Sequence, residues 1–116
     1  MYGNGTIRQT ALLVNMTNDT IFVYEEVTGA IKEIEIAPSD RELPEEPESR
    51  RKDDRVHYVC EPRIAEEIRR GGRPLSDVAI VRNKSLGRDG KLITRLVWGN
   101  NPHIEVRLFN ANNAAY

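Results

Sequence analysis

The stretch VHYVCEPRIAEEIRRGG, from Val56 to Gly72, carries the signals of a strand and of a helix in direct succession. Val56–Cys60 is rich in β-branched and aromatic residues, which favour an extended strand. Pro62 suits the first position of a helix, because its missing N–H would have no partner there in any case. The glycine pair Gly71-Gly72 ends the predicted helix after Arg70. Its apolar residues lie on one side, which is enough to dock it against a sheet: Ile64, Ala65 and Ile68.

The chain on either side of this stretch predicts further short strands, each rich in β-branched or aromatic residues and bounded by turn residues. They cover Ala11–Asn15, Thr20–Glu25, Ile31–Ile36, Asp77–Asn83, Lys91–Trp98 and His103–Phe109. In the third of these runs, Ile34 and Ile36 share one face and Glu33 and Glu35 the other, with the period of a half-buried strand. Asp89-Gly90 is typical of a hairpin turn. The sequence therefore predicts an α+β fold, predominantly antiparallel β with one short helix at about residues 62–70.

Chain length and one run of charge define the expected organisation. The 116 residues, of 13.2 kDa, fit a single small domain spanning 1–116. Residues 40–55, DRELPEEPESRRKDDR, are almost entirely charged or proline, so we expect an exposed loop with nothing to bury. The tail 110–116 and the first ten residues are expected to fray.

Composition argues against several classes of protein. No window approaches the roughly 18 to 20 apolar residues of a membrane span, and Met1–Thr10 lacks a basic segment leading into an apolar one. One cysteine, Cys60, and two histidines cannot form an internal disulfide or close a structural zinc site. We therefore expect a cytoplasmic protein with no membrane association, no metal and no cofactor, in which Cys60 is a small buried hydrophobe.

Charge is divided unevenly along the chain. Residues 1–61 carry 13 acidic and 7 basic side chains, whereas 62–116 carry 5 acidic and 10 basic ones. Eight of those ten are arginine: Arg63, Arg69, Arg70, Arg73, Arg82, Arg88, Arg95 and Arg107. The planar guanidinium fork suits carboxylate and phosphate oxygens, so this excess predicts an anion-binding surface. The alternative is that these arginines pair with the acidic half across the fold. A sequence pI near 6.1 argues against binding of duplex nucleic acid.

The candidate ligand contacts follow from this excess. We expect Arg63, Arg73, Arg82 and Arg88 to contact an anion, and Asn15, Thr17 and Asp77 to orient it by hydrogen bonds. Trp98 is expected in the core; otherwise it, Tyr24 or Tyr58 would stack on a base. No phosphate-binding glycine loop or nucleophile-elbow motif occurs. His57 and Cys60 point to opposite faces of one strand, so no catalytic residue is assigned.

Two patches of the sequence resemble a family of short, largely uncharacterised phage and prophage proteins that open with an Asn-Leu-Thr-Pro-His strand motif. The first is LVNMTNDTI, from Leu13 to Ile21, followed by Ile36-Ala37-Pro38-Ser39. The second begins at YVCEPRIA, from Tyr58 to Ala65, and continues through Arg73, Asp77-Val78, Val81–Asn83 and Arg88–Ile93. Asn18-Asp19 replaces the Pro-His of the motif, so no role of that histidine carries over. The resemblance implies a phage origin, and hence the host cell cytoplasm.

Three hypotheses of function follow. The first is a non-enzymatic phage accessory protein that sequesters a small phosphorylated or nucleotide-like ligand, such as a host anti-phage defence signal. It is expected to be a homo-oligomer, because so small a domain builds a deep pocket only with a partner copy. The second is a protein–protein interaction module, a phage structural accessory or an inhibitor of a host protein, that uses an edge strand or the 40–55 loop. The third, a hydrolase, would need His57 or His103 beside a carboxylate.

Overall fold

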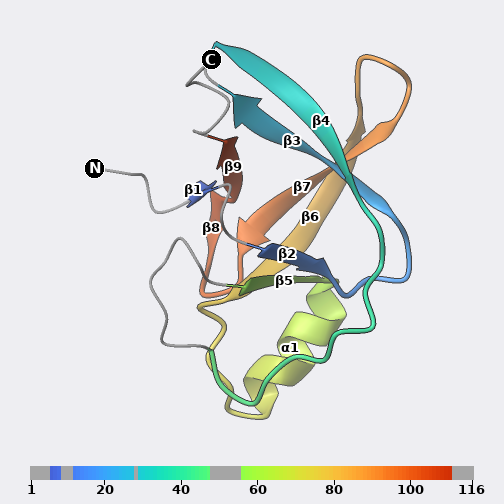
Figure 1. Cartoon of the computed structure of the whole chain (residues 1–116). Helices are drawn as coiled ribbons and strands as arrows, with labels where there is room; N and C mark the ends of the chain where they lie inside the picture. The colour runs from blue at the N-terminus through green and yellow to red at the C-terminus, as the bar shows by residue number, and fades with distance from the viewer. Residues whose placement is uncertain (1–5, 9–11, 28, 48–55, 111–116) are drawn as a thin grey trace.

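The computed structural model describes residues 6–8, 12–27, 29–47 and 56–110, which form strands and a single helix (Figure 1). In chain order the elements are β1 (Thr6–Arg8), β2 (Leu12–Asn15), β3 (Ile21–Val27), β4 (Ala30–Ile36), β5 (Val56–Cys60), α1 (Pro62–Arg70), β6 (Val78–Leu86), β7 (Leu92–Trp98), β8 (Asn101–Glu105) and β9 (Arg107–Asn110). The predicted α+β class, dominated by strands and with one short helix, is confirmed.

The described strands form one sheet in the order β1-β9-β3-β7-β6-β5-β2, with β4 added to β3 and β8 added to β7. Antiparallel pairing, which the sequence predicts to predominate, joins β3 to β4, β6 to β7 and β7 to β8. The other pairs are parallel. The sheet is therefore mixed. Two of the parallel pairs follow from long connections: α1 carries the chain back between β5 and β6, and the β3–β4 hairpin separates β2 from β5.

Helix α1 begins and ends at the residues that the sequence predicts. Pro62 occupies its first turn, and Gly71 donates its N–H to the Glu67 carbonyl at 3.1 Å. Gly72 follows with a φ of +87°, a conformation that residues with a Cβ rarely adopt. The apolar side of the helix packs on residues from β5, β6 and the segment between α1 and β6: Cys60, Leu75 and Val78. The local signals therefore set the bounds of the helix, and its apolar side determines how it docks.

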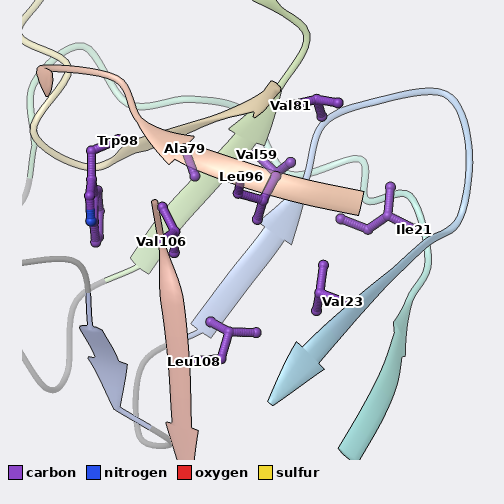
Figure 2. Close-up of a cluster of buried hydrophobic side chains, with 9 residues drawn as sticks. All are labelled: Ile21, Val23, Val59, Ala79, Val81, Leu96, Trp98, Val106 and Leu108. Carbon is purple, nitrogen blue, oxygen red and sulfur yellow. The ribbon is translucent and has the colours of Figure 1, made fainter. Parts of the chain in front are cut away.

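The main core lies on one face of the curled sheet. Figure 2 shows side chains from several strands gathered around one central space: Ile21, Val23, Val59, Ala79, Val81, Leu96, Trp98, Val106 and Leu108. Ile34 and Ile36 of β4 pack against this cluster, as their alternation with glutamate predicts. Trp98 is buried in it, as expected, and its ring meets that of His57 edge-on with centroids 5.3 Å apart.

Asn15 closes the sheet by joining β2 to the end of β4. Its backbone bridges Pro38, and its carbonyl accepts the Ser39 N–H at 2.9 Å. The buried side-chain Nδ2 donates to the Ile36 carbonyl at 3.0 Å and to the Asp19 carbonyl at 2.8 Å. Its Oδ1 accepts hydrogen bonds from the Thr17 N–H at 2.9 Å and the Thr17 hydroxyl at 2.6 Å. One side-chain amide on β2 therefore satisfies polar groups of two other segments, the turn after β2 and the end of β4.

Several expectations need correction. Within the predicted strand His103–Phe109 the ladder breaks at Val106, whose N–H bonds to the Leu96 carbonyl, so β8 and β9 are separate strands. Residues 6–8, expected to fray, pair with β9 as β1. The sequence predicts that the charged loop, residues 40–55, buries nothing. Leu43 of this loop is nevertheless half-buried against two apolar clusters. Asn110 belongs to β9, whereas the remaining tail, 111–116, and residues 48–55 of the charged loop lie outside the described residues.

The Asn15 amide makes the closure of the sheet sensitive to a single substitution. Asn15→Ala removes the side-chain partner of the Ile36 carbonyl and of the Thr17 N–H, so we expect the free energy of unfolding to fall by about 2 kcal/mol. Urea unfolding measures it. The control, Asn18→Ala, changes an exposed neighbour and should stay within about 0.5 kcal/mol of the original chain. Equal effects of the two substitutions would contradict the closing role of Asn15.

Candidate functional site

Arg73 and Asp77, two of the predicted ligand contacts, lie together but bind each other. Arg73 Nη1 and Nη2 donate to the two Asp77 carboxylate oxygens at 2.8 and 2.9 Å, with the side chains 10% and 1% exposed. Arg73 Nε and Nη1 also donate to the carbonyls of Pro44 and Pro74. Hydrogen bonding to Asp77 raises the pKa of the Arg73 guanidinium, so the guanidinium stays charged. Four of the five donors are thus engaged inside the protein.

The other predicted contacts are not gathered at one place. Asn15 and Thr17 are buried in the closure of the sheet, where they bond to each other and to backbone carbonyls. Arg63 is exposed on α1, Arg82 on β6, and Arg88 in the turn between β6 and β7. These three arginines line neither of the two hollows described below.

Internal ion pairs account for five arginines of the second half. Besides the Arg73 pair, both Arg69 and Arg70 pair with Glu66 on the surface of α1. Arg95 pairs with Glu105, and Arg107 with Glu26. Among the described residues only the Arg107 pair joins the acidic half to the basic half, so pairing within the second half dominates.

A cleft of about 450 Å³, here called the β3–β7 cleft, opens where two parallel strands separate. In the described pairing, β3 and β7 share one register pair, Phe22 with Ile93. Beyond it, the chain of β8 and β9 inserts between them: Glu105 pairs with Val97 of β7, and Leu108 with Glu25 of β3. The lining residues are Val23, Tyr24, Glu26, Ile31, Ser85, Ile93, Thr94, Arg95, Leu96, Glu105, Val106, Arg107 and Leu108.

Two oriented arginines line this cleft. Arg95 donates to the Glu105 carboxylate through Nη2 at 2.8 Å and Nε at 3.3 Å. Arg107 donates to the Glu26 carboxylate through Nη2 at 2.6 Å and Nε at 2.8 Å. These hydrogen bonds raise the pKa of both guanidinium groups. Because each glutamate binds one edge of its arginine, the Nη1 groups keep their donors for a ligand.

Thr94 places an unsatisfied hydroxyl among the residues that line the cleft. The residue is 4% exposed, yet its Oγ1 has no hydrogen-bond partner among the residues that the structure describes. A buried hydroxyl without a partner is costly, so a ligand group that reaches it gains a hydrogen bond at little expense. Tyr24, on the same lining, exposes an aromatic ring to solvent. The cleft therefore offers a hydroxyl, a ring and two sets of free guanidinium donors.

A second hollow, of about 590 Å³, lies between α1 and the turn that leads into β8. Its lining includes Arg69 and Arg73 beside apolar residues. Arg73 is engaged as described above, and Arg69 is paired with Glu66. Among the described residues that line this hollow, none has a buried side-chain polar atom that lacks a hydrogen-bond partner. The β3–β7 cleft is therefore the stronger candidate site.

The groups that could carry out chemistry lie elsewhere. Cys60 is buried against α1, and burial raises the pKa of its thiol to about 11, so it stays protonated at neutral pH, as expected of a small buried hydrophobe. His57 is buried against Trp98, and His103 is exposed on β8. In the described part of the chain, no three histidine, cysteine or acidic residues are arranged to hold a metal ion.

Comparison of the chain with protein-family models, curated proteins and solved structures finds no match to any of them. The resemblance to phage proteins consequently stays a prediction from the sequence. No helix in the described ranges is long and apolar enough to cross a membrane.

The alternation of residue types in the sequence identifies few of the residues that line the cleft, because the pairing of distant strands brings them together. Glu105 and Arg107 lie on either side of Val106, which predicts a polar face on that segment, whereas Arg95 is two residues from Ile93 and shares a face with it, so no polar face is predicted on β7. Nothing in these patterns indicates that the segment around Val106 inserts between β3 and β7. Sequence analysis therefore names Tyr24 only as an alternative stacking ring and assigns no ligand contact to Thr94, Arg95 or Arg107.

The Arg73–Asp77 pair should act as a structural clamp. Asp77→Ala leaves a nearly buried guanidinium without its carboxylate, so we expect the free energy of unfolding to fall by about 3 kcal/mol in urea titrations. Arg70→Ala, which removes an exposed cation on α1, should leave stability nearly unchanged. If both substitutions were equally mild, the pair would not hold the 40–47 segment to β6.

Thr94→Val tests whether the cleft hydroxyl is unsatisfied. The substitution keeps the side-chain shape and removes the buried hydroxyl, so the free energy of unfolding should rise by about 1 kcal/mol. Thr17→Val is the matched control, because the Thr17 hydroxyl bonds to Asn15 and to the Asp19 carbonyl, and its loss should destabilise the protein. A similar destabilisation by both substitutions would show that Thr94 already has a partner.

Proposed function

We propose that the protein is a non-enzymatic binding protein that holds a small nucleotide-like ligand in the β3–β7 cleft. The observation that carries this proposal is the buried, unpartnered hydroxyl of Thr94 on the lining of a cleft with two pre-oriented arginines. Donors held in place by other residues lose little entropy when they bind, which favours affinity. A cleft of about 450 Å³ lies within the range of small-molecule sites.

The lining defines the chemistry of the ligand. Tyr24 suits a flat ring by stacking, the free Nη1 groups of Arg95 and Arg107 suit anionic oxygens, and Thr94 suits one further polar group. Isoleucine, leucine and valine side chains complete the lining and favour a partly apolar ligand. A nucleoside that carries a phosphate meets all of these requirements.

Charge in the cleft limits how many phosphates fit. Two guanidinium groups and two carboxylates line it, so the arginines and glutamates cancel. A triphosphate would bring several negative charges close to Glu26 and Glu105 and would be repelled. A ligand with one negative charge fits better, which favours a cyclic phosphodiester over a linear polyphosphate.

The mode of action that follows is capture without turnover. Neither histidine nor cysteine lines the cleft, and both of its glutamates are engaged by arginines. A protein of this kind acts by lowering the free concentration of its ligand. The narrower role, a phage accessory protein that captures a host defence signal, stays a prediction that rests on the sequence resemblance.

Thermal melting with a panel of cyclic and linear nucleotides tests the proposal. A cyclic mononucleotide at a hundred times its Kd should stabilise the folded protein by about 2.7 kcal/mol, a shift of several degrees in Tm. The matching nucleoside and the triphosphate should shift the Tm much less, because the first lacks the anion and the second is repelled.

Variants then assign the shift to the cleft. Tyr24→Ala, Arg107→Ala and Thr94→Val should each abolish most of the ligand-induced change in Tm, whereas Arg70→Ala on α1 should keep it. The absence of a shift with every nucleotide would overturn the proposed ligand class. A shift that survives all three cleft variants would place the site elsewhere.

A further inference from the structure

The β6–β7 hairpin presents a surface that the cleft does not use. We call it the cationic hairpin face and define it by Arg82, Lys84, Leu86, Arg88 and Leu92. All five residues are exposed, and the two leucines face each other across the hairpin with 73% and 54% of their surface open. None of the five lines the β3–β7 cleft. Exposed leucines flanked by charge are typical of an interaction surface.

The cations of this face are not neutralised inside the described part of the chain. Arg82, Lys84 and Arg88 make no ion pair with any described residue. Lys91, also on the hairpin, differs, because it pairs with Asp89 at 3.6 Å and lies over the Phe22 ring at 5.0 Å. The face therefore carries three uncompensated positive charges beside an exposed apolar pair.

The same chain carries a surface of opposite charge. The acidic segment, residues 37–46, exposes Asp40, Glu42, Glu45 and Glu46, and none of these carboxylates pairs with a described cation. Leu43, half-buried, and the Pro44 carbonyl, bound by Arg73, fix the segment to the fold. Its first residues, Ala37 and Pro38, expose apolar atoms. The acidic segment is thus anchored to the fold, carries exposed carboxylates and begins with two exposed apolar residues.

We propose that the protein self-associates by docking the cationic hairpin face of one copy on the acidic segment of another. Three positive charges meet a segment whose four exposed carboxylates outnumber its one exposed cation, Arg41, and the leucine pair covers the apolar atoms of Ala37 and Pro38. A net charge of −1 leaves little long-range repulsion between copies. Since the contact joins two different surfaces, it closes as a reciprocal dimer or continues as a ring. The proposal is independent of the nucleotide site.

A protein surface fits the hairpin better than the other anionic partners. Single-stranded nucleic acid would require rings for stacking, and the exposed hairpin face offers two leucines instead. The segment that complements the face is present on every copy at equal concentration. Nucleic acid and anionic lipid therefore enter as outcomes of the test.

Sedimentation analysis of charge-reversed variants tests the contact. The original chain should sediment as an oligomer at about 50 mM salt and dissociate towards the monomer at about 500 mM. Two triple variants should each be monomeric: one changes Arg82, Lys84 and Arg88 to Glu, and the other changes Glu42, Glu45 and Glu46 to Lys. Mixed in equal amounts, they should associate again, because the acidic hairpin of one then meets the basic segment of the other.

The controls separate charge from folding. Arg69→Glu with Arg70→Glu reverses two cations on α1 and should leave the oligomer intact. Leu86→Ser with Leu92→Ser changes only exposed positions and should weaken association without unfolding. A monomeric original chain at low salt, or two variants that do not associate when mixed, would overturn the proposal. Loss of binding to single-stranded DNA or to phosphatidylserine vesicles in the hairpin variant, with the oligomer unchanged, would assign the face to that partner instead.

Discussion

The hydrogen bonds of the Asn15 side chain hold together segments that the sequence keeps apart. A buried polar group needs a hydrogen-bond partner within the protein. The Asn15 side chain supplies that partner to the Ile36 carbonyl at the end of β4. The closure links β2 to the end of β4, and β4 pairs in turn with β3. The cleft lies beside this strand, where the chain of β8 and β9 inserts between β3 and β7.

The same requirement for hydrogen-bond partners separates structural polar residues from candidate functional ones. Asn15, Thr17, Arg73 and Asp77 have the residue types of a ligand site, yet they satisfy one another and the backbone. Thr94 is the contrast, because its hydroxyl is as buried as theirs and lacks a partner. Arginine content alone is therefore a poor guide to function in this chain. The donors that remain after internal pairing are more informative.

Local signals in the sequence were sufficient for β5 and α1, whose bounds match their prediction. The proline, the glycine pair and the runs of β-branched residues act within a few residues, so they need no knowledge of the fold. Contacts between residues far apart in sequence determine three further features: the parallel pairings, the insertion at Val106 and the burial of Leu43. The periodicity of the sequence does not predict such contacts. The cleft was missed for the same reason.

The central claim is that the β3–β7 cleft binds a singly charged nucleotide-like ligand. Amide chemical shifts recorded by NMR during titration with a cyclic mononucleotide test it most directly. The account predicts saturable changes at residues 93–96 and 105–108, which line the cleft, and none at α1. Changes confined to α1 and the turn into β8, or no saturable change at any nucleotide concentration, would contradict it.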